Sequence, residues 1–355
     1  MNYPGRQAAL RQALADRGVD ALIVVSPANV RYLTGFTGEG LLLAGETMLL
    51  SSDSRYRAEA KVAQVTETVC EPKGHWAGIA RLVREAGYCR VALEAQHTSV
   101  AALEDLGKEL DSVEFVPLRK AIEPLRQRKS EAEIDLLRRA ARVTDKALED
   151  FLAGGPLRQS EKLARLDLVR LMLERGAERE AFETIVACGP GSAEPHHTSR
   201  DTLLEGPAPL KIDLGACVAG YCADLTRTVY LGTPDTTFRK AYTVVYEAQQ
   251  HALEAVRAGV AARDVDRAAR QVIEEAGFGN NFGHGVGHGV GLEVHEGPRL
   301  GATSEDILEE GQVVTIEPGV YLQGWGGVRI EDLVVVRCDG AEVLSQAPKS
   351  GPEEL

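Results

Sequence analysis

The chain has 355 residues, 44% of them hydrophobic, and a formal net charge of -13 at pH 7. This length is enough for about two domains of roughly 150 residues each. Nucleic acids and anionic membranes are bound through clusters of Lys and Arg, so the acidic balance argues against both as partners and favours a neutral or zwitterionic small substrate.

The six cysteines are spread along the chain, and none belongs to a Cys-x-x-Cys pair. This usage predicts small buried side chains in a reducing compartment rather than a disulfide framework. The first residues contain no apolar core of signal-peptide length, and no stretch approaches the roughly 20 apolar residues of a membrane span. We therefore expect a cytoplasmic protein without membrane contact.

In the first third of the chain, helical patterns alternate with short apolar runs. A helical pattern at 7–18 is followed by apolar runs at 21–25 and 41–50, an alternation that predicts an α/β domain. The segment 116–130 is basic, contains two prolines and breaks this pattern, so it is predicted to be a linker. The expected domains are 1–123 and 124–355.

The second part of the chain repeats one order of elements. A capping box formed by Ser130 and Glu133 predicts the start of its first helix. Two helices followed by a hairpin, twice, predict a duplicated α+β domain with pseudo-twofold symmetry. The first set comprises a helix from Ser130, a helix over 161–174 and a hairpin over 210–232; the second comprises helices over 238–257 and 264–276 and a hairpin over 312–336.

Each predicted hairpin carries a pair of carboxylates. A turn at 218–219 would set Asp213 opposite Asp224, and the second hairpin would set Glu317 opposite Glu331. Opposed residues on one face have Cβ atoms about 4.5–5.5 Å apart, where like charges repel. Because the neighbouring residues are apolar, burial of these carboxylates requires a cation.

A metal site meets this requirement. Four carboxylates with one or more imidazoles form a hard, oxygen-rich donor set that suits Mn²⁺ and accepts Co²⁺, Fe²⁺ or Zn²⁺. Shared carboxylates in this number hold two ions roughly 3.5–4 Å apart, with a bridging water acidified for attack. Each acidic residue alone is more often a turn, cap or solvated strand-end residue, so the prediction of a two-metal hydrolase rests on the set.

The stretch GHGVGHGVGLEVHEGPR at 283–299 carries His284, His288 and His295 on a glycine-rich backbone. Glycine within a strand marks a bend or a close backbone approach. His288 is the candidate imidazole ligand beside the carboxylate pairs. The repeated HGVG does not match the Gly-x-Gly-x-x-Gly phosphate loop, and no Lys-Ser or Lys-Thr follows, so a nucleotide site is not predicted.

Together these segments resemble the pita-bread metallopeptidases, which include Xaa-Pro aminopeptidases, Xaa-Pro dipeptidases (prolidases) and methionine aminopeptidases. Segment 25–38, VSPANVRYLTGFTG, is similar to the creatinase-like amino-terminal domain of the proline-specific members. The resemblance implies a creatinase-like α/β domain followed by a pseudo-twofold pita-bread catalytic domain. Its motifs are IDLG at 212–215, ADLTRT at 223–228, GHGVGHGVGLEVHE at 283–296, TIEPGVY at 315–321 and GVRIED at 327–332.

The resemblance also implies a role for each matching residue. Two divalent ions would be bound, with Asp224 and Glu331 as bridges. Glu317 would in addition handle the proton of the attacking water, and His295 would stabilise the reacting carbonyl. The full set of implied metal ligands is Asp213, Asp224, His288, Glu317 and Glu331.

Further residues match positions near the substrate. His284 and His196 resemble substrate-side histidines, whereas His197 is expected to have no catalytic role. Arg329 would orient the acidic ligands, and Tyr321 would line the site.

The implied activity is hydrolysis of the bond before proline in short peptides with proline at the second position. Arg299 stands where prolidases carry an arginine that binds the carboxylate of a dipeptide, which favours a dipeptidase. A surface ion pair is the alternative for Arg299, and an Xaa-Pro aminopeptidase acting on tripeptides and longer is the alternative activity. A peptide-binding module, a metal-free creatinase-like hydrolase and a nucleic-acid scaffold are disfavoured, because all five ligand positions are filled and the chain is acidic. The resemblance further implies a homodimer.

Overall fold

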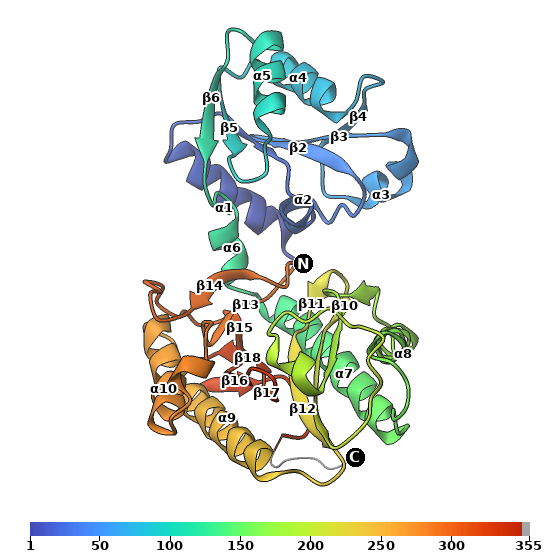
Figure 1. The fold of residues 1–355 in the computed structure, drawn as a ribbon. Helices are drawn as coiled ribbons and strands as arrows, with labels where there is room; N and C mark the ends of the chain where they lie inside the picture. The colour runs from blue at the N-terminus through green and yellow to red at the C-terminus, as the bar shows by residue number, and fades with distance from the viewer. Residues whose placement is uncertain (350–355) are drawn as a thin grey trace. The chain divides into compact units, whose positions relative to one another are not determined.

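The computed structural model describes residues 1–349 (Figure 1). The chain divides into two compact units, Met1–Arg126 and a second unit that begins at Gln127. The domain boundary expected after residue 123 stays a prediction.

The first unit is a mixed six-stranded sheet with helices packed on it. Its helices are α1 (Tyr3–Ala15), α2 (Pro27–Thr34), α3 (Arg57–Val62), α4 (His75–Ala86), α5 (Val100–Glu109) and α6 (Glu123–Gln127), and its strands are β1 (Ala21–Val24), β2 (Gly40–Ala44), β3 (Met48–Ser52), β4 (Glu67–Cys70), β5 (Arg90–Glu94) and β6 (Glu114–Leu118). The order is β4-β3-β2-β1-β5-β6, in which β2 is antiparallel to both neighbours and the other pairs are parallel. Helices α4 and α5 bury apolar side chains against this sheet, so the expected α/β domain is confirmed.

The prediction of a linker at 116–130 is wrong for part of that segment. Residues 116–118 pair with β5 as the end of β6. Pro117 is tolerated there because β6 is an edge strand, whose outer N–H groups have no partner strand. The prolines suggested a break in regular structure, because the sequence does not show that Pro117 lies in an edge strand, where a proline is tolerated.

The second unit contains two sets of helices and strands in the same order. Its helices are α7 (Glu131–Ala153), α8 (Glu161–Glu174), α9 (Thr236–Ala255) and α10 (Ala262–Glu275), with short 3-10 turns η2 (Gly189–Ala193) and η3 (Gly279–Asn281). Its strands are β7 (Arg179–Glu180), β8 (Ile185–Cys188), β9 (Ala208–Leu214), β10 (Ala216–Val218), β11 (Tyr221–Cys222), β12 (Leu225–Leu231), β13 (Gly287–Gly289), β14 (Glu296–Leu300), β15 (Val313–Ile316), β16 (Gly319–Leu322), β17 (Gly326–Arg329), β18 (Asp332–Val336) and β19 (Ala341–Val343).

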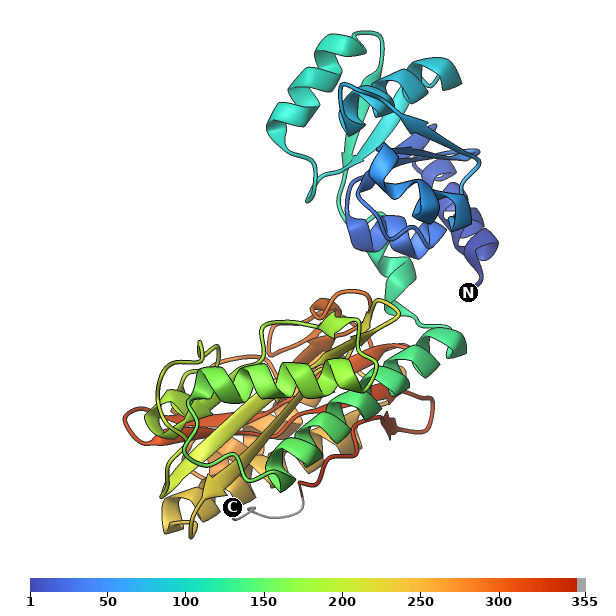
Figure 2. The same cartoon turned by 90° about the vertical axis from the view of Figure 1, so that its right-hand side faces the viewer.

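Each set has its own hydrophobic core. In the first, α7 and α8 pack on β8, β9 and β12; in the second, α9 and α10 pack on β15 to β18. Figure 2 shows α7 and α8 lying over one side of the long strands. The predicted capping box opens α7, and α8 spans the predicted residues. The duplicated α+β architecture is therefore confirmed.

The register of the second hairpin agrees with the prediction. Ile316 pairs with Asp332 in β15–β18, and Gly319 pairs with Arg329 in β16–β17, around a turn at Gly324. Residues 317 and 331 lie between these two paired segments. Glu317 and Glu331 are thus opposed, as expected.

The register of the first hairpin differs from the prediction by two residues. Asp213 pairs with Thr226 rather than with Asp224. The cause is the turn, which is formed by Ala219 and Gly220 with φ angles of 49° and 83° and not by residues 218 and 219. A shift of two residues keeps every side chain on its face of the sheet, so both aspartates still face the same side.

The two hairpins meet beside these carboxylates. The Glu331 backbone N–H donates to the Thr226 carbonyl at 3.1 Å. Thr228 Oγ1 donates to the Arg329 carbonyl and accepts from the Arg329 N–H. These bonds join β12 to the strand that carries Arg329 and Glu331, so the carboxylates of both halves face one space.

All six cysteines are free. Cys188, Cys217 and Cys222 are buried, as expected, but Cys70, Cys89 and Cys338 are exposed, so the expectation of burial is wrong for these three. Within residues 1–349, no helix has the length and apolar character that a membrane span requires.

Candidate active site

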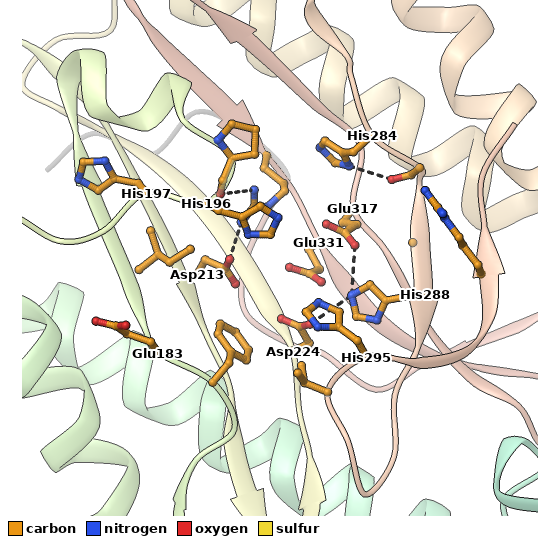
Figure 3. A pocket seen from close by; sticks show the side chains of 18 of the residues that line it. Glu183, His196, His197, Asp213, Asp224, His284, His288, His295, Glu317 and Glu331 are labelled. Atoms are coloured by element: carbon orange, nitrogen blue, oxygen red, sulfur yellow. Dashed lines mark hydrogen bonds and ion pairs between the residues drawn. The ribbon is translucent and has the colours of Figure 1, made fainter. Parts of the chain in front are cut away.

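A cavity of about 820 Å³ opens where the two hairpins meet. Its wall contains ten of the predicted site residues, which are His196, Asp213, Asp224, His284, His288, His295, Arg299, Glu317, Arg329 and Glu331. Figure 3 shows the acidic residues grouped at its centre, with His288 and His295 beside Asp224. Tyr321 does not line the cavity; it is buried behind His284 and Arg329.

The acidic residues are buried together. Asp213, Asp224 and Glu331 are 7%, 5% and 2% exposed. Burial, reinforced by the neighbouring carboxylates, raises the pKa of Asp224 and Glu331 well above the ordinary range. Burial also raises the pKa of Glu317 to about 7. This cluster is unfavourable as a group of anions unless a cation lies among them.

The orientation of His288 fits such a cation. Its Nδ1 lies 3.1 Å from the Gly289 carbonyl, which can only accept, so Nδ1 carries the proton. Burial lowers the pKa of His288, and the ring is neutral. The lone pair of Nε2 therefore points towards Asp224 Oδ2 at 3.6 Å and Glu317 Oε1 at 3.4 Å. A lone pair aimed at two carboxylates is the arrangement of a metal ligand.

Two further observations support a metal site. Asp224, His288 and Glu331 each offer one ligand atom, and these atoms lie within 4.8 Å of one another. Asp213 Oδ1 is buried and has no hydrogen-bond partner in residues 1–349. An unpartnered buried oxygen requires an explanation, and an ion would satisfy it. The carboxylate-rich donor set fits a hard divalent ion.

Arg329 connects Asp213 with Tyr321 and with the loop that precedes His196. Its guanidinium contacts Asp213 Oδ2 and donates to Thr226 Oγ1 at 2.9 Å. It also donates to the Tyr321 hydroxyl at 3.1 Å and to the Pro195 carbonyl at 3.2 Å. One buried side chain thus fixes an acidic residue, a tyrosine and a loop.

Both ring nitrogens of His284 are engaged inside the protein. Nδ1 donates to the Gly285 carbonyl at 2.8 Å. Burial lowers the pKa of His284 to about 4, so Nε2 is an acceptor, and the Tyr321 hydroxyl donates to it at 2.9 Å. Since Arg329 in turn donates to that hydroxyl, the ring is held at the cavity wall as a neutral imidazole.

The neighbouring residues His196 and His197 have opposite environments. His196 is exposed to the cavity. His197 is buried, with Nδ1 at 2.8 Å from Glu194 and Nε2 at 2.9 Å from Glu161. In the view of Figure 3 the His196 ring lies near Asp213, whereas the His197 ring lies farther to the left, away from His288 and Glu317. Both nitrogens of His197 are occupied, which agrees with the expectation that it has no catalytic role.

His295 and Arg299 extend along the other side of the cavity. The His295 ring lies edge-on to His288, with centroids 4.4 Å apart. The Arg299 backbone N–H donates to Asp306 at 3.1 Å. Its guanidinium forms no ion pair or hydrogen bond with any residue among 1–349, so the surface ion pair considered for it is not observed in that part of the chain.

Sequence reasoning missed several residues that support the site. Thr226 Oγ1 donates to Glu331 at 2.7 Å, and Thr315 Oγ1 donates to Glu317 at 3.2 Å. Thr315 lies two residues before Glu317 on the same face of a strand, a spacing that the sequence does show. Thr226 could have been found only from the correct register, because it lies opposite Asp213.

Comparison with known proteins gives the family. Residues 135–337 match metallopeptidase family M24, and residues 6–128 match the creatinase/prolidase N-terminal domain. The chain therefore belongs to metallopeptidase family M24, and the expected fold and enzyme class are confirmed. Membership implies divalent metal ions, which the donor set fits.

Relatives of this chain are similar over almost their whole length. The chain is 33% identical to an Xaa-Pro dipeptidase of Pyrococcus furiosus, over 94% of this chain and 95% of that protein. The solved structure of an Xaa-Pro dipeptidase from Bacillus anthracis is 34% identical, with a TM-score of 0.95 and complete coverage of both chains. That of an X-Pro aminopeptidase from Thermotoga maritima is 33% identical, with a TM-score of 0.90 over 97% of this chain and all of that chain.

Proposed function

We propose that the protein is a two-metal Xaa-Pro dipeptidase that hydrolyses the bond before proline in dipeptides. The names of the Pyrococcus furiosus and Bacillus anthracis relatives support this activity. The observation that carries the dipeptide preference is the guanidinium of Arg299, which lines the same cavity as the acidic cluster and is not engaged by any of residues 1–349. A dipeptide presents its terminal carboxylate close to the scissile bond, and guanidinium binds carboxylate in a bidentate, specific manner.

Five residues would hold the ions in this proposal, which are Asp213, Asp224, His288, Glu317 and Glu331. Ions bound there supply Lewis acidity and lower the pKa of a bound water. Glu317 would take the proton of the attacking water and pass it towards the proline nitrogen. His295 would donate to the oxyanion, and His196 and His284 would border the peptide. Arg329 would keep Asp213 in its ligating orientation.

Hydrolysis of Ala-Pro and Ala-Pro-Ala by the Mn²⁺-loaded protein, followed by liquid chromatography, tests the preference. We expect Ala-Pro to be the better substrate, and Arg299→Ala to lower kcat/KM for Ala-Pro roughly 10- to 100-fold, the range for a lost hydrogen bond to a charged group. Arg263→Ala is the matched control, because Arg263 is exposed on α10 and does not line the cavity. An unchanged preference in Arg299→Ala would contradict the role of Arg299.

The second candidate is an Xaa-Pro aminopeptidase that acts on tripeptides and longer peptides. The name of the Thermotoga maritima structure favours it, at an identity close to that of the dipeptidases. In that case Ala-Pro-Ala would be cut as well as Ala-Pro or better, and Arg299→Ala would change neither rate.

We also propose Mn²⁺ as the metal, a homodimer and a cytoplasmic location. The oxygen-rich donor set supports Mn²⁺, and the six free cysteines support a reducing compartment. Elemental analysis of protein purified without added metal tests the first proposal, and light scattering during size-exclusion chromatography tests the second.

A further inference from the structure

Lys211 is a fully buried basic residue that does not line the cavity. It lies on β9, two residues before Asp213, and its exposure is 0%. Other buried cations of the second unit face a carboxylate, as Arg227 faces Asp332 and Lys129 faces Glu296. Lys211 forms no ion pair with any residue among 1–349. Burying an amine is unfavourable unless its N–H groups are hydrogen-bonded, so the contacts that Lys211 makes with the backbone hold it in place.

The Lys211 side chain binds the backbone immediately before His196. Its Nζ donates to the Glu194 carbonyl at 2.5 Å and approaches the Pro195 carbonyl at 3.4 Å. The Pro195 carbonyl also accepts from Arg329. An ammonium and a neutral amine both donate hydrogen bonds, so this anchoring does not depend on the protonation state of Lys211.

His196 needs such an anchor. It lies between the turn η2 and strand β9, outside regular secondary structure. Its imidazole forms no hydrogen bond with the rest of residues 1–349, so its position in the cavity is set by the backbone that carries it. A misplacement of about 1 Å in an active site can reduce the rate about 10²-fold, and groups on loops are held less well than groups on strands.

A second contact places Lys211 beside Tyr321. The Lys211 Nζ lies 5.3 Å from the centre of the Tyr321 ring. The Tyr321 hydroxyl in turn holds His284. Lys211 therefore contacts the supports of two histidines that border the cavity.

We propose that Lys211 is a positioning residue for His196, holding residues 194 and 195 so that the imidazole faces the bound peptide. This inference rests on the proposed function, in which His196 borders the substrate. It assigns a catalytic consequence to a side chain that does not line the cavity.

The experiment is a double-mutant cycle between Lys211→Met and His196→Ala, with hydrolysis of Ala-Pro by the Mn²⁺-loaded protein. Met matches the Lys side chain as far as Cε and removes the donor nitrogen. We expect Lys211→Met to lower kcat/KM roughly 10- to 100-fold, with unchanged metal content. In the His196→Ala background, the same substitution should change kcat/KM less than about twofold, because the residue it positions is already absent.

Lys146→Met is the matched control, because Lys146 is exposed on α7 and pairs with Glu149; it should leave kcat/KM unchanged. Wild-type activity in Lys211→Met would overturn the inference, and so would equal losses in both backgrounds, which indicate a general structural role. If His196→Ala is fully active, the proposed role of His196 fails and the inference fails with it. If Lys211→Met does not fold, the cycle is run with Lys211→Leu, which also removes the donor.

Discussion

The acidic floor of the cavity and its histidine rim are built in opposite ways. The floor comprises Asp213, Asp224, Glu317 and Glu331, and the rim comprises His196, His284 and His295. Floor residues lie in strands or directly beside them, and they are bonded to side chains such as Thr226, Thr315 and Arg329. Rim residues lie in loops or at the edge of a short strand. In the proposed function, strands hold the groups that would bind the ions, whereas the groups that would meet the substrate lie on loops and need separate anchors.

Removal of a floor residue should have the largest effect. We expect Asp224→Asn to lose bound metal and to lower kcat/KM by about 10³-fold or more, because bridging carboxylates hold both ions of a two-metal site. Elemental analysis and Ala-Pro hydrolysis measure the two losses together.

The control for this substitution is Asp145→Asn. Asp145 is also buried, but it accepts from the backbone N–H groups of Gln346 and Ala347 and does not line the cavity. It should retain metal and activity and lose stability. Full metal content in Asp224→Asn would mean that metal binding does not depend on Asp224.

The floor should also make metal binding depend on pH. Burial raises the pKa of Glu317 from its ordinary 4.5 to about 7, and it raises the pKa of Asp224 and Glu331 well above the ordinary range. In the metal-free protein these carboxyls hold protons that an ion must displace, so affinity should rise with pH, by up to roughly tenfold per pH unit for each proton displaced. Calorimetry in buffers of different ionisation enthalpy counts these protons; no release at pH 6 would contradict the prediction.

The raised pKa of Glu317 also makes the stability of the metal-free fold depend on pH. A carboxyl whose pKa is higher in the folded than in the unfolded chain ionises first in the unfolded chain. Without metal, the Glu317 contribution to stability is therefore fully present below about pH 4.5 and is lost as the pH rises towards 7. Thermal melts should show a larger loss in the metal-free wild type than in metal-free Glu317→Gln, in which only Asp224 and Glu331 still contribute.

The floor could be predicted from the sequence more completely than its supports. The second hairpin was placed correctly because Gly324 marks its turn. The first was shifted because Ala219, a residue that rarely adopts a positive φ, shares the turn with Gly220. The shift did not remove Asp213 and Asp224 from the site, since a displacement of two residues preserves the face. Because side chains alternate between the two faces of a strand, a register error of two residues does not change which side chains are predicted to face the site.

The supports of the rim could not be predicted, because they join elements far apart in the chain. Lys211 reaches the loop before His196 only because β9 passes beneath it. Arg329 and Pro195 are 134 residues apart. Neither contact leaves a periodic pattern or a motif in the sequence, and each depends on the packing of two hairpins against each other. The family resemblance supplied the rim histidines, and the structure supplied what holds them.

The smallest change in activity is expected within the rim loop itself, at His197. His197→Leu should leave kcat/KM for Ala-Pro within about threefold, because both ring nitrogens face carboxylates and none is left for a substrate. It should lower the free energy of unfolding by about 2 kcal/mol, since Glu161, which is 0% exposed, loses a hydrogen-bond partner.

His196→Ala should behave in the opposite way. Because its imidazole is exposed to the cavity and unbonded within residues 1–349, its removal should leave the melting temperature unchanged and lower kcat/KM about 10²-fold, as for a lost group that positions the substrate. Urea unfolding and Ala-Pro hydrolysis of both variants measure the contrast. Equal losses of activity in the two would mean that the loop acts as one unit, and that position in the cavity, rather than chemistry at His196, limits the reaction.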